Sequence, residues 1–484
     1  MKTTHKLLFS VLLLLATACN KQIDEIRPLT KVTADGELAT ISGIEAATVG
    51  TYAVLALYFE PAQQDLGEDR GNNVTPQIWG PPAQSTDAFF YQNSSNPALG
   101  YNYSFYQTCY SQILSVNIVL DKMAGMDTVG WTADDQNNFM YSKGENLFLR
   151  ALTYFTLVRV YGKPYYLDGG ASLSVPLKKT GSITDKPAAS STKDVYSFVI
   201  NDLRQAAQLM KAPVSKTNNF ASTGAAWSLL SRVYLYMGGS VAKPDANANQ
   251  LAVTYADSVI DQSGGAYTLL QGQDYKNMFG DDEDGSLNRA NSTTNQEIIF
   301  ALNNSDTYYG SGIGVIYHDD PQGTGGAFFL PSSDLRAQFA AGDVRGTFFK
   351  VNPVSGFTET TKWLCLNLYT GTKAPDILFR LAELYLNRAE ANAKLGNIAA
   401  ARADLKAIHT RAGLAASDID AVADADVITA ILKERRLELA FEAHNSFDYF
   451  RNGLPMTRIA ADYNGTTFTV QPDDPKVEFT IPTN

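Results

Sequence analysis

The sequence predicts a mainly α-helical fold: a scaffold of tetratricopeptide-like helical hairpins with an irregular, loop-rich insertion that contains a few short strands. Three observations predict this class. Segment 144–162 spaces four apolar residues as one helix face requires: Phe148, Ala151, Phe155 and Val158. Segments 223–238 and 374–396 have the same character, and a glycine closes each of the three. Residues 272–373 instead alternate short β-prone runs with glycine-rich polar loops.

Taken in order, apolar spacing predicts helices over 40–59, 101–123, 134–161, 192–210, 222–237, 249–262, 376–395, 399–411 and 426–441. Residues 61–100 lose this spacing and are rich in Gly, Pro, Asn and Ser, which predicts a loop. Runs 297–302 and 362–368 have the composition of strands. The tail after Gly453 is short and polar, and we expect it to pack against the body.

The pair of helices over 376–411 fits the template of a tetratricopeptide unit. Its small, turn and packing positions are filled by Ala389, Gly396, Ala401, Leu405 and Ile408. Small residues allow two helices to approach closely, and Gly396 permits the turn between them. Residues 101–161 and 192–237 form comparable pairs with longer connections, so we expect degenerate copies of the unit there.

Composition narrows the class of function. The chain has 484 residues and a formal net charge of −11, which argues against nucleic-acid binding because phosphate contacts need a basic patch. Cys109 and Cys365 are expected to be buried thiols, and no Cys or His spacing predicts a metal site. The acidic run 281–284 does not match an EF-hand, so a solvated loop is favoured over calcium binding.

The first residues predict a lipoprotein. Residues 1–18 combine Lys2 and Lys6 with a short apolar run, as a secretory signal peptide does. The residues before Cys19 resemble a bacterial lipobox, which implies acylation of Cys19; a chance cysteine after an ordinary signal peptide is the alternative. We therefore expect a signal peptide over 1–18, a lipidated flexible tether over 19–39 and one helical domain over 40–484.

The charged helix over 433–450 invites a catalytic interpretation, but a structural one is favoured. Arg435 and Glu438 are three residues apart and are expected to pair along the helix. His318, His409 and His444 form no metal-binding spacing. Two carboxylates that hydrolyse a glycoside need only be close in space, which leaves a lipoprotein glycosidase as an alternative.

Several stretches together resemble the SusD/RagB family of nutrient-binding outer-membrane lipoproteins. They occur in the family's order at 101–123, 144–165, 225–238, 377–393, 432–453 and 479–482. The resemblance implies a SusD-like fold, with an N-terminal SusD-like part over about 40–240 and a C-terminal RagB/SusD part over about 265–484. It also implies a partner, a SusC-like TonB-dependent outer-membrane transporter.

Two loops combine aromatic rings with polar groups, as neutral carbohydrate sites do. Rings stack on sugar faces while amide, carboxylate and guanidinium groups bond the hydroxyls, and loops on a rigid scaffold are where such residues gather. The resemblance points to the same two regions. The predicted ligand-binding residues are Asp69, Arg70, Asn72, Trp79, Tyr91, Asn303, Tyr308, Tyr309 and Tyr317. For any single residue, a ring that pins its loop to the body is the alternative; Trp79 is the strongest candidate.

The predicted function is non-catalytic capture of an oligosaccharide at the cell surface and its delivery to the SusC-like transporter. The chain is expected to be lipid-anchored in the outer membrane and to face the cell exterior, and no enzyme activity, cofactor or metal is predicted. A helical-repeat protein-interaction or peptide-binding lipoprotein without a glycan ligand is the second hypothesis. It predicts that the loop aromatics are buried or form one broad apolar patch.

Overall fold

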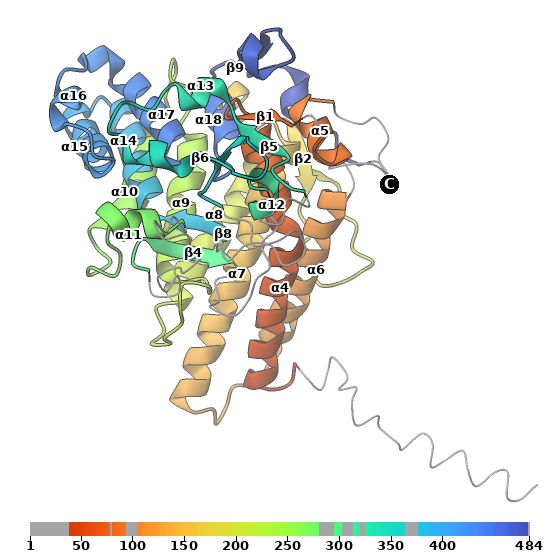
Figure 1. Ribbon diagram of the computed structural model, residues 1–484. Coiled ribbons are helices and arrows are strands. Elements are labelled where there is room, and N and C mark those ends of the chain that lie inside the picture. The colour runs from red at the N-terminus through yellow and green to blue at the C-terminus, as the bar shows by residue number, and fades with distance from the viewer. Residues whose placement is uncertain are drawn as a thin grey trace, which may run out of the picture.

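The computed structural model describes residues 38–77, 80–92, 104–279, 295–302, 313–319, 325–363 and 376–482, and the side chains of these residues except 57–61. The described part is mainly helical with a few short strands, which confirms the predicted fold class. Long helices stand side by side, and α4 and α7 extend below the rest of the molecule (Figure 1).

The scaffold helices are α4 (Ile41–Gln64), α6 (Ser104–Ala124), α7 (Ala133–Tyr161), α8 (Thr192–Leu209), α9 (Thr223–Met237), α10 (Ala246–Ile260), α14 (Leu381–Lys394), α15 (Ile398–Arg411) and α17 (Val427–Glu438). Shorter helices are α5 (Ala83–Phe89), α11 (Gly272–Asn277), α12 (Ile313–Tyr317), α13 (Ser333–Arg336), α16 (Ala416–Asp420) and α18 (Asn445–Arg451). A π-helical turn, Asp65–Asp69, continues α4.

Helix α7 lies at the centre of the N-terminal helices. A capping box between Thr132 and Asp135 starts it, because each side chain accepts a hydrogen bond from the other residue's backbone N–H. From Tyr141 to Tyr161 nearly every residue is buried, so the single apolar face expected from the sequence is wrong for this half of the helix. Arg150 is among the buried residues and forms an ion pair with Asp202 of α8 (2.7 Å).

Helices α14 and α15 form the predicted hairpin and pack against each other. Ala389, Ala401 and Leu405 are fully buried in one apolar cluster, as the repeat template requires. Gly396 makes the turn with φ +81°, a conformation that glycine adopts without strain. The sequence thus located this repeat unit correctly, although α14 is shorter than expected.

The first five residues of the helix expected over 376–395 form a strand instead. Strand β8 (Asp376–Arg380) pairs antiparallel with β4 (Ile298–Leu302), and every residue of both strands is buried. Cross-strand pairing between segments far apart in the chain overrides the local helical pattern here. The strand expected over 362–368 is absent at 362–363, and its other residues lie outside the described ones.

Four further antiparallel pairs connect the other described strands. They join β1 (Val74–Pro76) to β5 (Phe329–Pro331), β2 (Leu173–Pro176) to β3 (Ala189–Ser191), β6 (Phe349–Val351) to β7 (Thr358–Thr360), and β9 (Met456–Arg458) to β10 (Phe468–Val470). The β1–β5 pair joins the early loop, residues 61–100, to the insertion, residues 272–373.

The main core joins the two ends of the sequence. Phe148 of α7 meets Phe300 of β4 edge to face, with ring centroids 5.3 Å apart, and Phe300 stacks on Phe379 of β8. Tyr52 of α4 and Phe479 of the tail belong to the same buried cluster. The predicted packing of the tail against the body is therefore observed.

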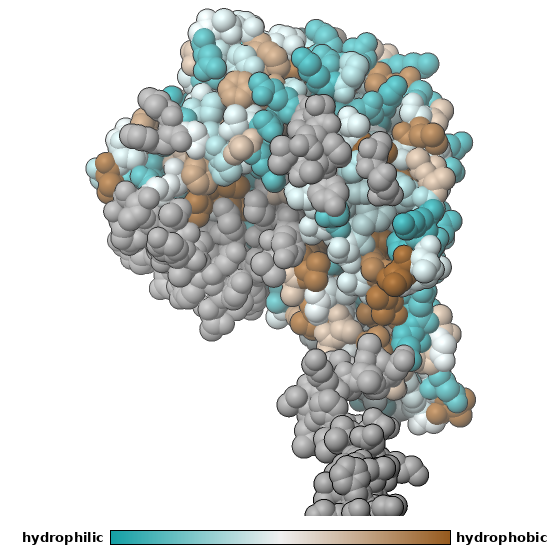
Figure 2. Space-filling view, turned by 90° about the vertical axis from the view of Figure 1, so that its right-hand side faces the viewer, coloured by the Kyte–Doolittle hydropathy of each residue, from teal (hydrophilic) through white to brown (hydrophobic). Residues whose placement is uncertain are grey.

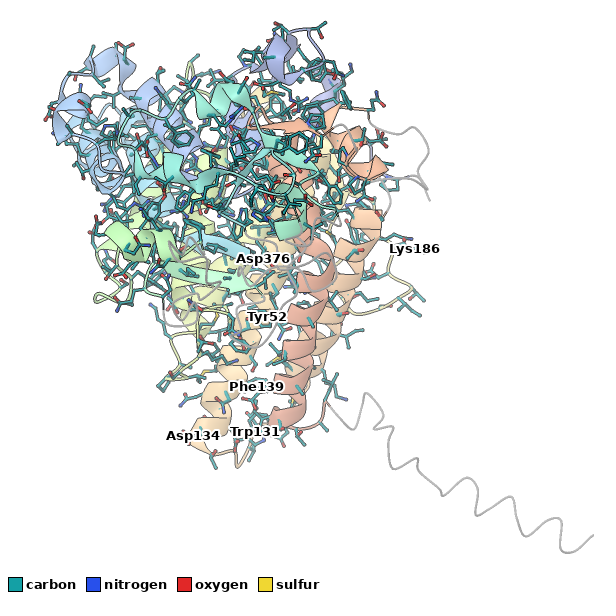
Figure 3. All side chains as sticks on the ribbon, in the orientation of Figure 1. Tyr52, Trp131, Asp134, Phe139, Lys186 and Asp376 are labelled. Carbon is teal, nitrogen blue, oxygen red and sulfur yellow. The ribbon has the colours of Figure 1, made fainter. Side chains whose placement is uncertain are left out.

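Helices α4, α6 and α7 end in a narrow tip (Figure 3). At this tip Trp131 and Phe139 meet edge to face, with centroids 5.3 Å apart. The α4–α6 side of the molecule carries hydrophobic side chains over its lower half (Figure 2). Within the described ranges, no helix is at once long and apolar enough to span a bilayer.

Candidate functional site

Several predicted functional residues lie outside the described residues. They are Trp79, Asn303, Tyr308, Tyr309 and the predicted lipidation site Cys19. The acidic run 281–284 and Cys365 also lie outside the described residues. The predicted roles of these residues stay predictions.

The other five predicted ligand residues are buried, which corrects the expectation that they are exposed. They are Asp69, Arg70, Asn72, Tyr91 and Tyr317, and none is more than 6% exposed. Each makes hydrogen bonds inside the protein. A surface ligand cannot stack on a ring that is already covered, so their observed contacts are structural.

Arg70 and Tyr91 fasten the early loop to the C-terminal tail. The Arg70 guanidinium lies between two rings, 4.5 Å from the centroid of Tyr91 and 4.6 Å from that of Phe479. It donates to the carbonyl of Val477 (3.1 Å), and the Tyr91 hydroxyl donates to the Arg70 carbonyl (2.6 Å). Removing either side chain would therefore loosen the loop from the tail.

Asp69 and Tyr317 connect the two predicted loop regions. The Tyr317 hydroxyl donates to Asp69 Oδ1 (2.9 Å) and joins α12 to the π-helical turn. Burial, with help from the neighbouring Asp65 carboxyl, raises the pKa of Asp69 well above its ordinary value. Glu68 in the same turn has its pKa raised to about 7 by burial. This acidic turn is thus a buried element that favours protonated carboxyls.

The charged helix α17 is part of a buried ion network that sequence analysis missed. The network contains Glu297, Asp343, Arg345, Lys362, Arg380, Arg411, Glu434, Glu438 and Glu442. Arg380 lies in β8, Arg411 in α15, and Glu434 and Glu438 in α17. The other residues lie just before β4, in segment 343–362 and just after α17. The structural interpretation of α17 agrees with this, because its carboxylates hold distant segments together.

The expected pairing of Arg435 with Glu438 is wrong. Arg435 instead donates to Asp448 of α18 (2.7 Å) and to Asn387 of α14 (2.6 Å). Glu438 instead meets Arg380 of β8 (2.6 Å). Tertiary partners with fixed geometry prevail over a neighbour on the same helix, whose pairing contributes only about 0.2–0.5 kcal/mol.

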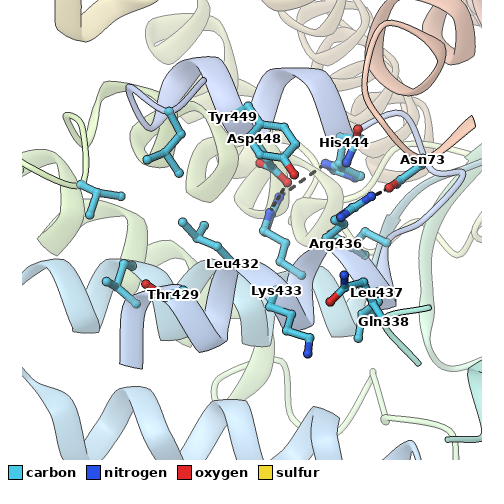
Figure 4. Close-up of a pocket in the computed structure, with 16 residues that line it drawn as sticks. Asn73, Gln338, Thr429, Leu432, Lys433, Arg436, Leu437, His444, Asp448 and Tyr449 are labelled. Atoms are coloured by element: carbon cyan, nitrogen blue, oxygen red, sulfur yellow. Dashed lines mark hydrogen bonds and ion pairs between the residues drawn. The ribbon is translucent and has the colours of Figure 1, made fainter. Parts of the chain in front are cut away.

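A pocket of about 410 Å³ opens between α17 and α18 (Figure 4). Aliphatic side chains form much of its wall: Val241, Ile428, Leu432, Leu437, Leu439 and Leu454. The half-buried ring of Tyr449 completes the wall, and Asn73 of the early loop lies at its edge. Its volume falls within the range of small-molecule sites, about 300–1,000 Å³.

Several of the polar groups that line this pocket have protein partners. Arg436 donates to Asn73 Oδ1 (2.8 Å) and to Asp334 (2.7 Å). Burial lowers the pKa of His444 well below its ordinary value, so its ring is neutral at pH 7. Asn72 donates to the hydroxyl of Tyr449 (3.1 Å) and supports the wall from behind. The pocket therefore presents an apolar surface with a rim of fixed hydrogen-bonding groups.

Sequence analysis missed this pocket because its walls come from separate segments. Leu432 and Lys433 are neighbours in the sequence, but Val241 and Leu454 are brought to them only by tertiary packing. The one available signal was the aliphatic side of α17, which also fits an ordinary core-facing stripe. Among the described residues, no three His, Cys, Asp or Glu side chains are arranged to hold a metal ion.

Several solved structures have the same fold as this chain. A SusD superfamily protein from Bacteroides vulgatus has a TM-score of 0.76 at 25% identity and covers 92% of this chain and 96% of its own. A SusD superfamily protein from Bacteroides thetaiotaomicron has a TM-score of 0.74 at 25% identity with the same coverage. The fold is that of the SusD superfamily.

Sequence comparisons agree. The family model described as the SusD family matches residues 367–483, and the one described as starch-binding, associating with the outer membrane, matches residues 54–235. Starch-binding protein SusD of Bacteroides thetaiotaomicron is 26% identical over 247 residues. That alignment covers 50% of this chain and 36% of the relative's length. The chain belongs to the SusD family, which confirms the resemblance found in the sequence.

Proposed function

We propose that this chain is a cell-surface lipoprotein that binds an oligosaccharide without cleaving it and delivers it to a SusC-like TonB-dependent transporter. The observation that carries the proposal is membership of the SusD family, whose models match both the N-terminal and the C-terminal part of the chain. The matched relative is named for starch binding, and one model is described by association with the outer membrane.

The proposed glycan site is formed by the predicted loop residues that the structure does not describe. Trp79 and Tyr308 supply rings for stacking, and Asn303 supplies an amide for hydroxyl groups. The buried residues Arg70 and Tyr317 act as a frame, because their hydrogen bonds fix the segments on either side of these loops. Weak, stacking-based recognition of this kind places ligand contacts on loops held by a rigid body.

The pocket between α17 and α18 favours a second candidate, a peptide-binding function without a glycan ligand. Its aliphatic walls suit a leucine or phenylalanine side chain better than a sugar, whose hydroxyl groups would lose hydrogen bonds to water there. The fixed rim around Asn73 and Arg436 would then orient the peptide backbone.

Calorimetric titration of the protein lacking residues 1–19 with a panel of glycans tests the two candidates. We expect one glycan class to bind, and Trp79→Ala and Tyr308→Ala each to weaken it at least about tenfold. Leu432→Glu, which places a charge in the pocket wall, should leave that affinity unchanged. If only Leu432→Glu abolishes binding, the ligand occupies the pocket. Release of shortened glycan during the titration would contradict the non-catalytic role.

The anchor is tested separately in the membrane. Mass spectrometry of the mature N-terminus should find Cys19 as the first residue with its acyl chains attached. Cys19→Ser should release the protein from the outer membrane, since two or more acyl chains are needed for stable anchoring. An unacylated first residue would contradict the proposed localisation.

A further inference from the structure

A second cavity, of about 30 Å³, is lined by the C-terminal end of α7, by α18 and by the tail. We call it the basic cavity, because Arg70, Arg159, Lys163 and Arg451 line it and none of its described lining residues is acidic. It shares no lining residue with the pocket between α17 and α18. A cavity lined by charge of one sign concentrates its electric field and attracts ions of the opposite sign. On a chain whose net charge is −11, such a cavity is a candidate site for an anion.

The Tyr196 hydroxyl lacks a hydrogen-bond partner within the described part of the chain. Tyr196 belongs to α8, lines the basic cavity and is only 4% exposed. Its ring packs against those of Phe155 and Tyr165, with centroids 5.9 Å and 5.0 Å away. Burial raises the pKa of this hydroxyl, so it keeps its proton at pH 7 and can donate. Buried polar groups are nearly always hydrogen-bonded, and this hydroxyl therefore needs an acceptor inside the cavity.

Arg159 lines the same cavity and is held mainly by aromatic rings. Its guanidinium carbon lies 4.6 Å from the ring centroid of Phe155 and 4.7 Å from that of Phe447. It donates to the hydroxyls of Tyr236 and Thr156, but both distances are 3.4 Å, longer than an ordinary hydrogen bond of about 2.7–3.2 Å. No carboxylate of the described residues pairs with it. A guanidinium group in this state suits an oxyanion that it can bond through two N–H groups.

The end of α7 stabilises a cation but supplies no partner for the Tyr196 hydroxyl. Arg159 lies in the last turn of α7, where the backbone carbonyls carry partial negative charge. That interaction accounts for a guanidinium group without a carboxylate, whereas the hydroxyl still needs an acceptor of its own. The two groups lie close together, because the charge of Arg159 acts on the ionisation of Tyr196. An anion that accepts from both satisfies both.

The cations Arg451 and Lys163 have carboxylate neighbours. Arg451 pairs with Glu390 (2.6 Å) and Asp448 (2.7 Å). Lys163 is exposed and lies near Glu478, whose pKa is raised by burial against the opposing effect of Lys163. The charges of Arg451 and Lys163 are therefore largely compensated by the protein itself.

Arg70 is the second cation without a carboxylate partner among the described residues. Its guanidinium donates to the carbonyls of Val477 (3.1 Å) and Lys476 (2.6 Å). Burial lowers the pKa of Arg70, as expected for a cation that no nearby carboxylate compensates. Arg70 and Arg159 together leave the basic cavity with a positive charge, next to a hydroxyl that can donate.

We infer that the basic cavity binds an oxyanion, with the Tyr196 hydroxyl and the Arg159 guanidinium as donors and Lys163 at the mouth. The chemistry recognised is a carboxylate or sulfate group, either free in solution or carried by an acidic sugar. One water needs about 10–15 Å³, so a cavity of about 30 Å³ admits the charged group and excludes a sugar ring. The inference goes beyond the proposed function and does not depend on it, because it uses neither the transporter nor the predicted glycan loops.

Equilibrium dialysis of the full-length protein in a neutral detergent, at constant ionic strength, tests the inference. The probes are radiolabelled sulfate and, separately, radiolabelled glucuronate, with glucose as the uncharged counterpart of glucuronate. Tyr196→Phe and Arg159→Gln should each weaken anion binding at least about tenfold, since hydrogen bonds to charged groups are among the strong ones. Tyr385→Phe, in α14 and outside the cavity, is the matched control for the lost hydroxyl and should leave the affinity unchanged.

The melting temperature separates binding from folding. Tyr196→Phe should not lower it in the absence of the probes, because the hydroxyl has no protein partner to lose. Lys163→Gln should weaken binding about twofold to fivefold, as expected for an exposed charge, and Lys186→Gln, at an exposed lysine elsewhere, should not.

The two probes also separate the sources of the anion. Tighter binding of glucuronate than of sulfate assigns the anion to an acidic sugar, the reverse order assigns a free ion, and either result supports the cavity. The inference is overturned if neither probe binds, if glucose binds as well as glucuronate, or if Tyr196→Phe and Arg159→Gln bind both probes as the unmodified protein does.

Discussion

Replacing Glu438 by glutamine removes the charge at the centre of the buried ion network. Its carboxylate is fully buried and faces three guanidinium groups, those of Arg345, Arg380 and Arg411. The Tyr275 hydroxyl also donates to it (3.3 Å). Glutamine keeps the shape of the side chain, so the change isolates the charge from the packing.

The cost follows from what is left behind. Removing one partner of a buried ion pair typically destabilises a protein by about 3–5 kcal/mol, because the remaining charge is uncompensated. Arg380 keeps Glu297 and Glu442 as partners, and Arg345 keeps Asp343 and Glu434. We therefore expect Glu438→Gln to lower the free energy of unfolding by about 3 kcal/mol at pH 7, the lower end of that range.

The pH dependence gives a second, sharper readout. Burial alone would raise the pKa of Glu438, but the three guanidinium groups outweigh it and hold the pKa well below its ordinary value. A depressed pKa contributes stability above the unfolded-state value of about 4.3 that is lost as the pH falls below it. The unmodified protein should therefore lose stability in acid more steeply than Glu438→Gln does.

Urea denaturation of the protein lacking residues 1–19, followed by circular dichroism at several pH values from 7 down to 3, measures both effects. Asp420→Asn is the control, because it breaks an ion pair with Lys406 whose side chains are 59% and 32% exposed. Such surface pairs contribute about 0–1 kcal/mol. A loss below about 1 kcal/mol in Glu438→Gln, together with an unchanged acid slope, would refute the role given to this network.

Two further predictions concern the π-helical turn. Glu68 accepts hydrogen bonds from Asn73 and from the Phe441 N–H, and burial raises its pKa to about 7. The stability that this carboxyl contributes is therefore lost as the pH rises toward and through 7. Between pH 5 and pH 8, the urea denaturation midpoint should fall less in Glu68→Gln than in the unmodified protein. Equal slopes would contradict this. A methyl group at Gly67 would lie 2.1 Å from the carbonyl oxygen of Ala443. Gly67→Ala should therefore lower the free energy of unfolding by about 1–3 kcal/mol in the same assay. An unchanged midpoint would contradict this and show that α4 and the α17–α18 connection can move apart without cost.

The helical scaffold was predictable because its signals are local. The spacing of apolar residues in α6, α8 and α9, and the glycine after α14, follow from the geometry of the helix itself. Strand β8 was not predictable in this way, because its residues continue the pattern of α14 and only β4 turns them into a strand. Local patterns are overridden where a distant segment supplies hydrogen bonds.

The candidate site also has features that local sequence indicates and features that only contacts between distant residues decide. Polar and aromatic composition marked the early loop correctly as an unusual segment, but it did not distinguish an exposed ring from a buried one. Tyr91 is covered because Arg70 and the tail lie against it, and Tyr317 because it bonds Asp69. These contacts join residues up to about four hundred positions apart, and no spacing in the sequence encodes them.

The sequence by itself determined the helical scaffold, the repeat unit of α14 and α15, the family and the expectation of a lipid anchor, since each depends on residues that are near one another in the chain. Only the tertiary structure decided which charges pair with Glu438, which rings are buried and where the pocket opens. Burial and ion pairing depend on three-dimensional neighbours, and the chain acquires those neighbours only when it folds.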